Sequence, residues 1–413
     1  MILKKNSQKA FYLFLFLHLL LWTLIPSLSN TNLPLDTIEA LAWGSNLDWG
    51  FNKHPPFSAF AVEFFFTIFG NNDWAYYLLS QIFVLIAFYF VWKFSNELLK
   101  DKLYALLSVL LLSGIYFYNY TTPEFNVNVS QLPFWALSVY FFWRGINLNK
   151  NIDWILFGIF SALGFLSKYL FIYILLALFI FFIFNFKKYK KSLNKYFFSI
   201  VISLAILTPH FFWLFENNFI TIFYGLDRSG VSEFNYIDHF KNPIIFLIKQ
   251  FIILIPFFLM FYLILKKFKF SINKKNKDII FLLSINLIPI ALILTTSIVT
   301  GAKIRTMWMT PFYLFFGTLF VQIFKKNIDF KFFKGNVLNE YNKITKNDGT
   351  PFKVYSPFWR NAEQFYLERL PDKINKVKKC KKINTLFKNQ IKSEDILPKS
   401  DWYKKFEKYW EPS

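Results

Sequence analysis

The residues of this sequence best suited to chemistry lie in a polar segment near its start. The stretch DWGFNKHPPF, residues 48–57, holds an acid, a lysine, a histidine and two prolines. Asp36 lies upstream at the start of a segment with helical spacing, and Glu39, three residues later, completes the pattern of a capping box. We expect short helices that lie along a membrane surface and hold Asp36, Lys53 and His54 near a lipid phosphate. The alternative is a helix cap followed by a rigid loop.

Further polar residues stand where apolar runs end. Glu124 and Asn126 lie in TTPEFNVN, which either carries functional groups or forms an Asx or proline turn between two spans. Lys168 follows an apolar run in LGFLSKY, and it is either functional or extended towards the membrane interface. His210 follows a proline near the end of a span, which favours an interfacial histidine without a catalytic part.

The composition predicts the setting of these residues. Of the 413 residues, 55% are hydrophobic and 23% are aromatic, which is more apolar surface than a soluble core of this length can bury. The single cysteine, Cys380, excludes an intramolecular disulfide framework, and no CxxC or His-rich cluster indicates a structural metal. A membrane protein with about ten spans is therefore predicted. The apolar segments lie near residues 10–29, 74–92, 103–119, 130–147, 152–186 (as two short helices), 196–214, 244–265, 278–298 and 306–324.

The basic residues orient these spans. The formal net charge is +22 although only 17% of the residues are charged. In a chain with many spans, this charge indicates cytoplasmic anchoring rather than nucleic-acid binding. If the spans alternate, the basic residues gather on one side, at 93–102, 144–150, 187–191, 266–277 and 325–326. We therefore expect both termini in the cytoplasm and the functional site on the opposite side, which holds residues 30–73, 118–130, 215–243 and 299–305.

The outer segments also resemble a known family. An acid in the first outer loop, then Trp-Gly, then a pair of polar residues before Pro-Pro is similar to the integral-membrane glycosyltransferases of the GT-C fold, of the protein-mannosyltransferase, aminoarabinose-transferase and galacturonic-acid-transferase type. TTPEFNVN, LGFLSKY and TPHFFWLFENNFITIFYG follow in the family's order, so the resemblance covers about residues 8–325. It implies an all-α polytopic GT-C fold over residues 1–330, with juxtamembrane helices outside the cytoplasm, in a bacterial inner membrane.

The resemblance implies a reaction as well. A hexose or pentose would move, with inversion, from a polyprenyl-phosphate donor to an acceptor in the cell envelope, such as lipid A, lipopolysaccharide core, another glycolipid or a protein. Asp36 matches the family's catalytic acid and would act as the general base. The residues expected to bind the substrates, mainly by stabilising the lipid phosphate, are Lys53, His54, Glu124, Asn126, Lys168, Tyr169, Arg228 and Arg305.

One position departs from the family pattern. Several relatives have an acid where Lys53 stands, so that the pair before Pro-Pro helps to hold a divalent cation. Here that pair is Lys53 and His54, and few carboxylates besides Asp36 and Glu124 are at hand. We therefore expect a reaction without a metal and without another cofactor, in which cationic side chains stabilise the phosphate.

Residues 331–413 have a different, charged composition and are predicted to form a cytoplasmic tail. DGTPFKVYSPFWR at 348–360 and LPKSDWYKKFEKYWEP at 397–412 resemble short pieces of cryptochrome/photolyase proteins, near the junction of their antenna and flavin-binding domains. The flavin-binding helical domain has no counterpart in the sequence, so neither flavin nor nucleic acid is expected as a partner. The tail is either a basic cytoplasmic extension or the remnant of a neighbouring gene.

Two other functions are open for the chain. A transporter or flippase of lipid-linked sugars would also need many spans, but it should place ionisable groups near the bilayer midplane in matching halves. The acids of this chain instead gather in outer loops. A non-functional fusion product is the third reading, and the intact loop motifs around Asp36 argue against it.

Overall fold

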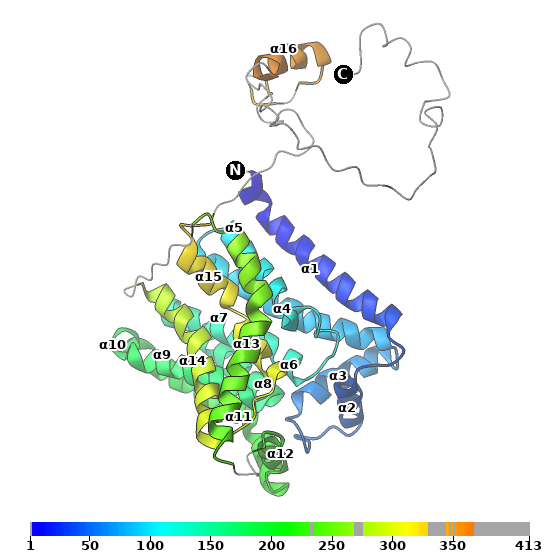
Figure 1. Ribbon diagram of the computed structural model, residues 1–413, viewed down its shortest axis with the longest axis vertical. Helices are drawn as coiled ribbons and strands as arrows, with labels where there is room; N and C mark the ends of the chain where they lie inside the picture. The colour runs from blue at the N-terminus through cyan, green and yellow to red at the C-terminus, as the bar shows by residue number, and fades with distance from the viewer. Residues whose placement is uncertain are drawn as a thin grey trace. The chain divides into compact units, whose positions relative to one another are not determined.

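The computed structural model describes residues 2–230, 235–267, 276–328, 344–346, 348–350 and 352–366. The chain divides into two units, residues 1–330 and 331–413, which are considered separately. Within the described residues the regular elements are helices, without a strand (Figure 1). The expectation of an all-α polytopic membrane protein is thus confirmed.

The first unit begins with four helices that lead into and out of the polar outer segment. A long helix, α1, packs along α4, where the rings of Phe11 and Trp92 stack with centroids 4.6 Å apart. Two shorter helices, α2 and α3, lie between α1 and α4 in the sequence. As expected from the proline pair, α3 begins directly after Pro56. The bounds are α1 (Ile2–Ser29), α2 (Leu35–Gly44), α3 (Phe57–Phe69) and α4 (Asp73–Leu99).

The remaining helices of this unit form the bundle behind the outer segment. The α-helices are α5 (Lys102–Leu110), α6 (Val127–Ser130), α7 (Leu132–Leu148), α8 (Asn151–Ser167), α9 (Ile172–Phe184), α10 (Phe186–Tyr189), α11 (Leu193–Glu216), α12 (Ile220–Arg228), α13 (Asp238–Leu263), α14 (Lys277–Thr300) and α15 (Phe316–Phe324). The 3₁₀ helices are η1 (Leu111–Gly114), η2 (Tyr116–Tyr118), η3 (Tyr169–Phe171), η4 (Lys190–Ser192) and η5 (Thr306–Tyr313).

Each apolar segment of the sequence contains a helix, but not every helix is long enough to span a bilayer. Among the described residues, five are long and apolar enough: Asn6–Ser29, Asp73–Leu99, Phe186–Glu216, Asp238–Leu263 and Lys277–Thr300. A sixth is possible if η5 and α15, which are bent by 49°, form one span. Shorter apolar helices occupy Phe57–Phe69, Lys102–Gly114, Asn151–Ser167 and Tyr169–Phe184. The expected number of about ten spans is therefore not confirmed.

Aromatic rings fill the centre of the bundle, which accounts for much of the phenylalanine content. Phe142 of α7 contacts Phe157 of α8, Phe181 of α9 and Phe281 of α14, with ring centroids 5.3, 6.5 and 6.2 Å away. Aromatic pairs at such distances add stability beyond the area that they bury. One cluster of large rings thus ties four helices together.

A glycine lets two helices approach closely beside this centre. A Cβ added to Gly158 of α8 would lie 2.5 Å from the carbonyl oxygen of Ser199 in α11. The Ser203 hydroxyl of α11 donates to the Gly158 carbonyl at 2.7 Å. Small residues and serine hydroxyls are the means by which helices associate in membranes. This contact fixes α11, whose far end carries part of the candidate site.

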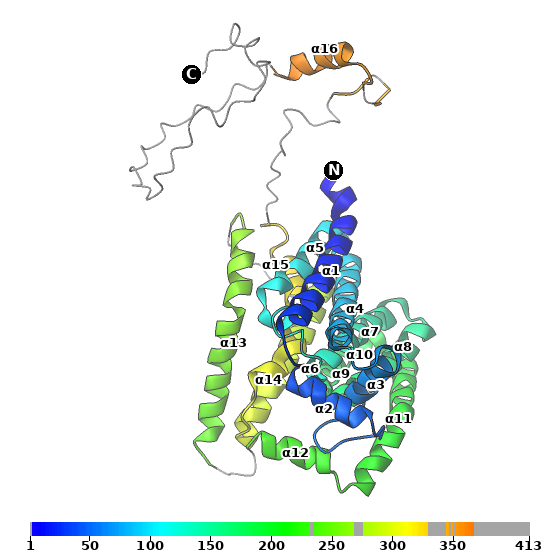
Figure 2. The same ribbon diagram turned by 90° about the vertical axis from the view of Figure 1, so that its right-hand side faces the viewer.

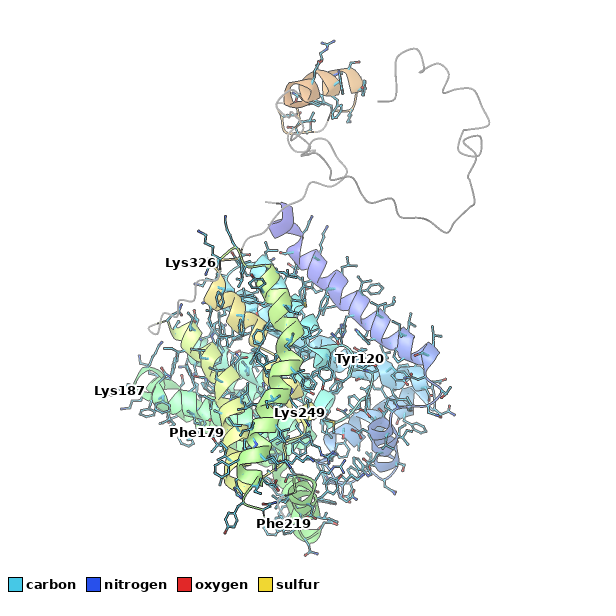
Figure 3. All side chains as sticks on the ribbon, in the orientation of Figure 1. Tyr120, Phe179, Lys187, Phe219, Lys249 and Lys326 are labelled. Atoms are coloured by element: carbon cyan, nitrogen blue, oxygen red, sulfur yellow. The ribbon has the colours of Figure 1, made fainter. Side chains whose placement is uncertain are left out.

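The two ends of the first unit differ in the elements that they carry. In both views, the N-terminal end of α1 and α15 lie towards one end, whereas α2, α3 and α12 lie towards the opposite end (Figures 1 and 2). The side-chain view places Lys326 at the first end and Phe219, which precedes α12, at the second (Figure 3). The polar outer segment of the sequence is thus at the end away from the start of α1.

The second unit is described only in part. It contains α16 (Tyr355–Tyr366), in which the rings of Tyr355 and Trp359 stack with centroids 6.2 Å apart. The segment 348–360 that resembles photolyases overlaps this helix, whereas its companion at 397–412 lies outside the described residues. The predicted identity of this unit therefore stays a prediction.

Candidate active site

The loop between α2 and α3 is held in place by side chains of α11 and α12. The indole nitrogen of Trp213 donates to the Asp48 carboxylate at 2.7 Å. The Thr221 hydroxyl donates to the Phe51 carbonyl at 2.6 Å. Each bond links positions about 165 to 170 residues apart in the sequence. The DWGF motif is therefore an anchor for the loop.

Gly50 is needed in this loop because Trp213 lies against it. A Cβ at position 50 would meet the Trp213 ring at 2.3 Å, so no larger residue fits without displacing the indole. The Trp213 ring also stacks on His210, with centroids 6.2 Å apart and an interplanar angle of 10°. The Trp-Gly pair of the first loop is thus explained by close packing on α11.

His210 joins the loop to η3. Its Nδ1 lies 2.5 Å from the Trp49 carbonyl oxygen, and its Nε2 lies 2.9 Å from the Tyr169 hydroxyl. A carbonyl can only accept, so Nδ1 carries a proton, and in the neutral ring Nε2 accepts from Tyr169. His210 is fully buried among protein side chains. It positions Tyr169, which was expected at the site.

The start of α2 is capped from outside, which overturns the predicted capping box. The N-cap of α2 is Pro34, and no side chain of α2 itself caps it. Instead, the backbone N–H of Asp36 donates to the Glu124 carboxylate at 3.3 Å. Since the N-terminus of a helix favours negative charge, Glu124 satisfies this end from the second outer segment. The Asp36 carboxylate is not used as a cap, and it forms no hydrogen bond or ion pair with any described residue.

Asn126 supports Glu124. Its side-chain oxygen caps α6 by accepting from the N–H groups of Asn128 and Val129 at 2.9 and 3.2 Å. Its side-chain nitrogen donates to the other oxygen of Glu124 at 3.2 Å. The Asx turn expected as the plain alternative is therefore present, and it also orients the carboxylate that touches α2.

Glu39 pairs with Lys53 rather than with the backbone of its own helix. The Lys53 ammonium donates to the Glu39 carboxylate, and both side chains are partly exposed. The hydrogen bond and the charge of Glu39 raise the pKa of Lys53. Lys53 thus stays charged, but Glu39 largely balances that charge.

Lys168 is buried, which contradicts the reading of a lysine extended to the interface. It lies between α8 and η3 and is 7% exposed. Its ammonium donates to the side-chain oxygen of Asn128 at 2.5 Å and lies over the Trp308 ring, 5.4 Å from the centroid. Burial lowers the pKa of Lys168 to about 7, with nearby Asp36 acting in the opposite direction.

These elements enclose one cavity of about 360 Å³. Most of the predicted site residues line it: Asp36, Lys53, His54, Lys168, Tyr169, Arg228 and Arg305. Glu124 and Asn126 do not line it, and Glu124 reaches it only through its bond to Asp36. The carboxylates of Asp36 and Glu39 and several cations, drawn from four parts of the sequence, thus face the same space.

The cavity also has residues that the sequence reading missed. Tyr173 donates through its hydroxyl to the Thr296 hydroxyl at 2.9 Å, which joins α9 to α14. Trp308 also lines the cavity, and its ring lies against the Lys168 ammonium. Glu39 lines the cavity too, although the sequence suggested for it only a part in a capping box. Tyr173 and Trp308 lie in apolar segments, where an aromatic residue reads as core. Only the proximity of Tyr173 to Tyr169, and of Trp308 to Arg305, along the chain could have suggested them.

The electrostatics of the cavity separate its groups. Burial, and then the charge of Glu39, raise the pKa of Asp36, whereas Lys168, Lys53 and Arg228 act in the opposite direction. Burial, and then Asp36, raise the pKa of Glu124. Burial together with the surrounding cations lowers the pKa of His54 to about 3. His54 is therefore neutral at pH 7. The sequence had suggested that His54 is one of the cations that stabilise the phosphate, and its lowered pKa contradicts that prediction.

The described residues contain no group of three histidine, cysteine or acidic side chains placed to hold a metal ion. The acids nearest the cavity are Asp36, Glu39 and Glu124. Glu39 accepts a hydrogen bond from Lys53, and Glu124 accepts one from the backbone at the start of α2. Reaction without a metal remains a prediction, which chelation can test.

The comparisons bear on the same region. Residues 53–213 match the family model of dolichyl-phosphate-mannose-protein mannosyltransferases. This match supports a membrane glycosyltransferase of the GT-C type. It includes Lys53, His54 and Lys168 and ends at Trp213, but Asp36 lies before it. No curated protein and no solved structure matches the chain.

Proposed function

We propose that the chain transfers a sugar from a polyprenyl-phosphate donor to an acceptor in the bacterial cell envelope, with inversion at the anomeric carbon. The observation that carries the proposal is the pairing, in one cavity, of the Asp36 carboxylate, which has no described partner, with the cations of Lys168, Arg228 and Arg305. The carboxylate can take the proton of the attacking acceptor hydroxyl, and the cations can stabilise the phosphate that leaves.

Asp36 is the proposed general base. The acceptor hydroxyl attacks the anomeric carbon, its proton passes to the Asp36 carboxylate, and the bond to the donor phosphate oxygen breaks. The raised pKa of Asp36 makes it a stronger base than an exposed aspartate, while the surrounding cations act against that rise. The bond between its backbone N–H and Glu124 fixes α2 and thus the carboxylate.

The cations are proposed to receive the leaving group. Negative charge grows on the phosphate as the glycosidic bond breaks, and positive groups fixed beforehand stabilise that charge without reorganising. Lys168 is held by Asn128 and Trp308, so its ammonium is fixed. Arg228 and Arg305 approach from the C-terminal end of α12 and from the segment before η5.

The direct test is Asp36→Asn. The amide keeps the shape of the side chain but cannot take the proton, so transfer should fall by about 10²–10⁴-fold. Asp73→Asn is the matched control, because Asp73 also lies in the first turn of a helix, α4, yet outside the cavity. Sugar transfer by purified, folded Asp36→Asn protein at nearly the wild-type rate would exclude Asp36 as the base.

The acceptor is sought in cells. Mass spectrometry of lipid A, core oligosaccharide and other glycolipids, with and without the gene, should show the loss of one hexose or pentose from one class. A chain that only moves lipid-linked sugars across the bilayer would instead show donor crossing in vesicles without sugar transfer to any acceptor. That outcome would replace the proposed reaction with transport.

A further inference from the structure

A second pocket lies beside the cavity, between α13 and the segment before η5. It has a volume of about 400 Å³ and is lined by Asn242, Phe246, Lys249, Lys303 and Arg305, among others. Arg305 lines both spaces, as do Ile304 and Met307. This basic pocket is therefore separated from the cavity by little more than one stretch of chain.

The basic pocket has unbalanced positive charge. Three cations line it, and no acid is among the described residues that do so. Within the described part of the chain, the side chains of Lys249, Lys303 and Arg305 form no hydrogen bond and no ion pair. Like charges that face one space repel each other, so an anion between them would stabilise the arrangement.

Lys249 sits where a lysine is costly. It lies eleven residues into α13, which is one of the candidate membrane spans (Figure 3). It lies five residues into the apolar run 244–265, which at a rise of 1.5 Å per residue is about 8 Å along the helix axis, roughly a quarter of the ~30 Å hydrocarbon core. Ionisable residues at such depth are rare and mark a binding function by default. A soluble anion would have to leave water to reach it, whereas a lipid phosphate arrives along the membrane.

We propose that the basic pocket binds the phosphate headgroup of a membrane lipid. Lys249, Lys303 and Arg305 receive the phosphate oxygens, and Ile245 and Phe246 of α13 lie next to the first atoms of the lipid chains. The bound lipid lies against Ile304, Arg305 and Met307, which also line the cavity. This site is a matter of binding alone, and it does not depend on the reaction proposed for Asp36.

The test uses the full chain in nanodiscs of phosphatidylcholine that contain a small share of phosphatidylglycerol. Native mass spectrometry then measures which lipid stays bound after release. The wild-type protein should retain phosphatidylglycerol in preference to phosphatidylcholine. Lys249→Met and Lys303→Gln should each weaken that retention about tenfold, the typical effect of losing one charged hydrogen bond.

Controls separate a site from general charge. Lys241→Gln removes an exposed cation from the first turn of α13 without touching the pocket, and it should leave retention unchanged. Lys249→Arg should restore it, and thermal unfolding of each variant shows that it is folded. Equal retention in Lys249→Met and wild type, or an equal loss in Lys241→Gln, would overturn the proposal. If inorganic phosphate alone binds as tightly as phosphatidylglycerol and displaces it, the ligand is a soluble anion and the lipid assignment fails.

Discussion

Replacing Lys168 with methionine tests the cationic wall most directly. Methionine has a similar length and fills the buried space, but it has neither the charge nor the donors. Lys168 is 7% exposed and its ammonium is fixed by Asn128 at 2.5 Å, so the cation is already desolvated and oriented for a phosphate. We expect Lys168→Met to lower kcat/KM for the lipid-phosphate donor while the protein stays inserted and folded.

The size of this loss follows from the contact that disappears. A hydrogen bond to a charged group contributes about 1.5–3 kcal/mol, and each 1.36 kcal/mol is a factor of ten in rate. The expected loss is therefore about 10- to 150-fold. A lysine extended to the membrane interface would contribute far less, because an exposed ion pair is worth about 0–1 kcal/mol.

The pH dependence gives a second readout of the same residue. The pKa of Lys168 in the free protein is about 7, so its charge is present below that pH and is lost as the pH rises through it. The wild-type kcat/KM should fall above pH 7, and this falling limb should be absent in Lys168→Met. Lys168→Arg, which stays charged, should also lack it.

The assay is donor consumption in proteoliposomes at a series of pH values. Lys325→Met is the matched control, since the Lys325 ammonium also donates to an oxygen, that of Leu99, at 2.6 Å and lies over a ring, that of Tyr104, at 5.0 Å, but outside the cavity. It should keep the wild-type rate and profile. A folded Lys168→Met protein with unchanged kcat/KM would refute the reasoning.

Three further outcomes are expected. Gly50→Ala should destabilise the protein by about 1–3 kcal/mol, because the added Cβ would collide with the Trp213 ring. Gly225→Ala is the control, because a Cβ there meets no atom within 4 Å and should not change stability. Equal melting temperatures of the two variants would contradict the expected strain at Gly50. EDTA should leave transfer by the purified protein intact, and a complete loss that one divalent ion restores would show a metal requirement. A chain truncated after Lys326 should insert and transfer sugar normally, because every residue that lines the cavity lies between 35 and 308; an inserted but inactive chain would show that the tail is needed.

Much of this arrangement could be predicted because it depends on local pattern. The apolar runs predict helices, and the helix after Pro56 begins where proline favours a start. Polar residues stand out where the apolar runs end, and Asp36, Lys168 and Arg305 do line one cavity. The number of spans was harder to predict, since apolar runs of similar composition become long helices or short, broken ones.

The errors all concern partners that are distant in the sequence. The pattern of Asp36 and Glu39 fits a capping box, but Glu124, 88 residues away, takes the helix end, and Lys53 takes Glu39. Lys168 was predicted to bind the donor, with a lysine extended to the interface as the alternative, and the sequence could not decide between the two because Asn128, which holds Lys168 inside, lies 40 residues before it. Local propensity cannot reveal such tertiary contacts.

The charges that line the cavity fit the change in charge that the proposed reaction would undergo. Asp36 and Glu39 contribute two negative charges, and Lys53, Lys168, Arg228 and Arg305 contribute four positive ones, so the net charge is +2 when Lys168 is protonated. A sugar–phosphate–lipid diester carries one negative charge, but the polyprenyl phosphate that leaves carries nearly two near pH 7. In the proposed reaction the Asp36 carboxylate takes the acceptor proton at the same time, so the charge of the lining rises to +3 as that of the phosphate approaches −2. The lining therefore attracts the leaving phosphate more strongly than the phosphate of the bound donor. Because only interactions that strengthen towards the transition state accelerate a reaction, this growing attraction favours bond cleavage rather than donor binding. Loss of the Lys168 proton would weaken that attraction, which is why the titration of Lys168 should change the rate.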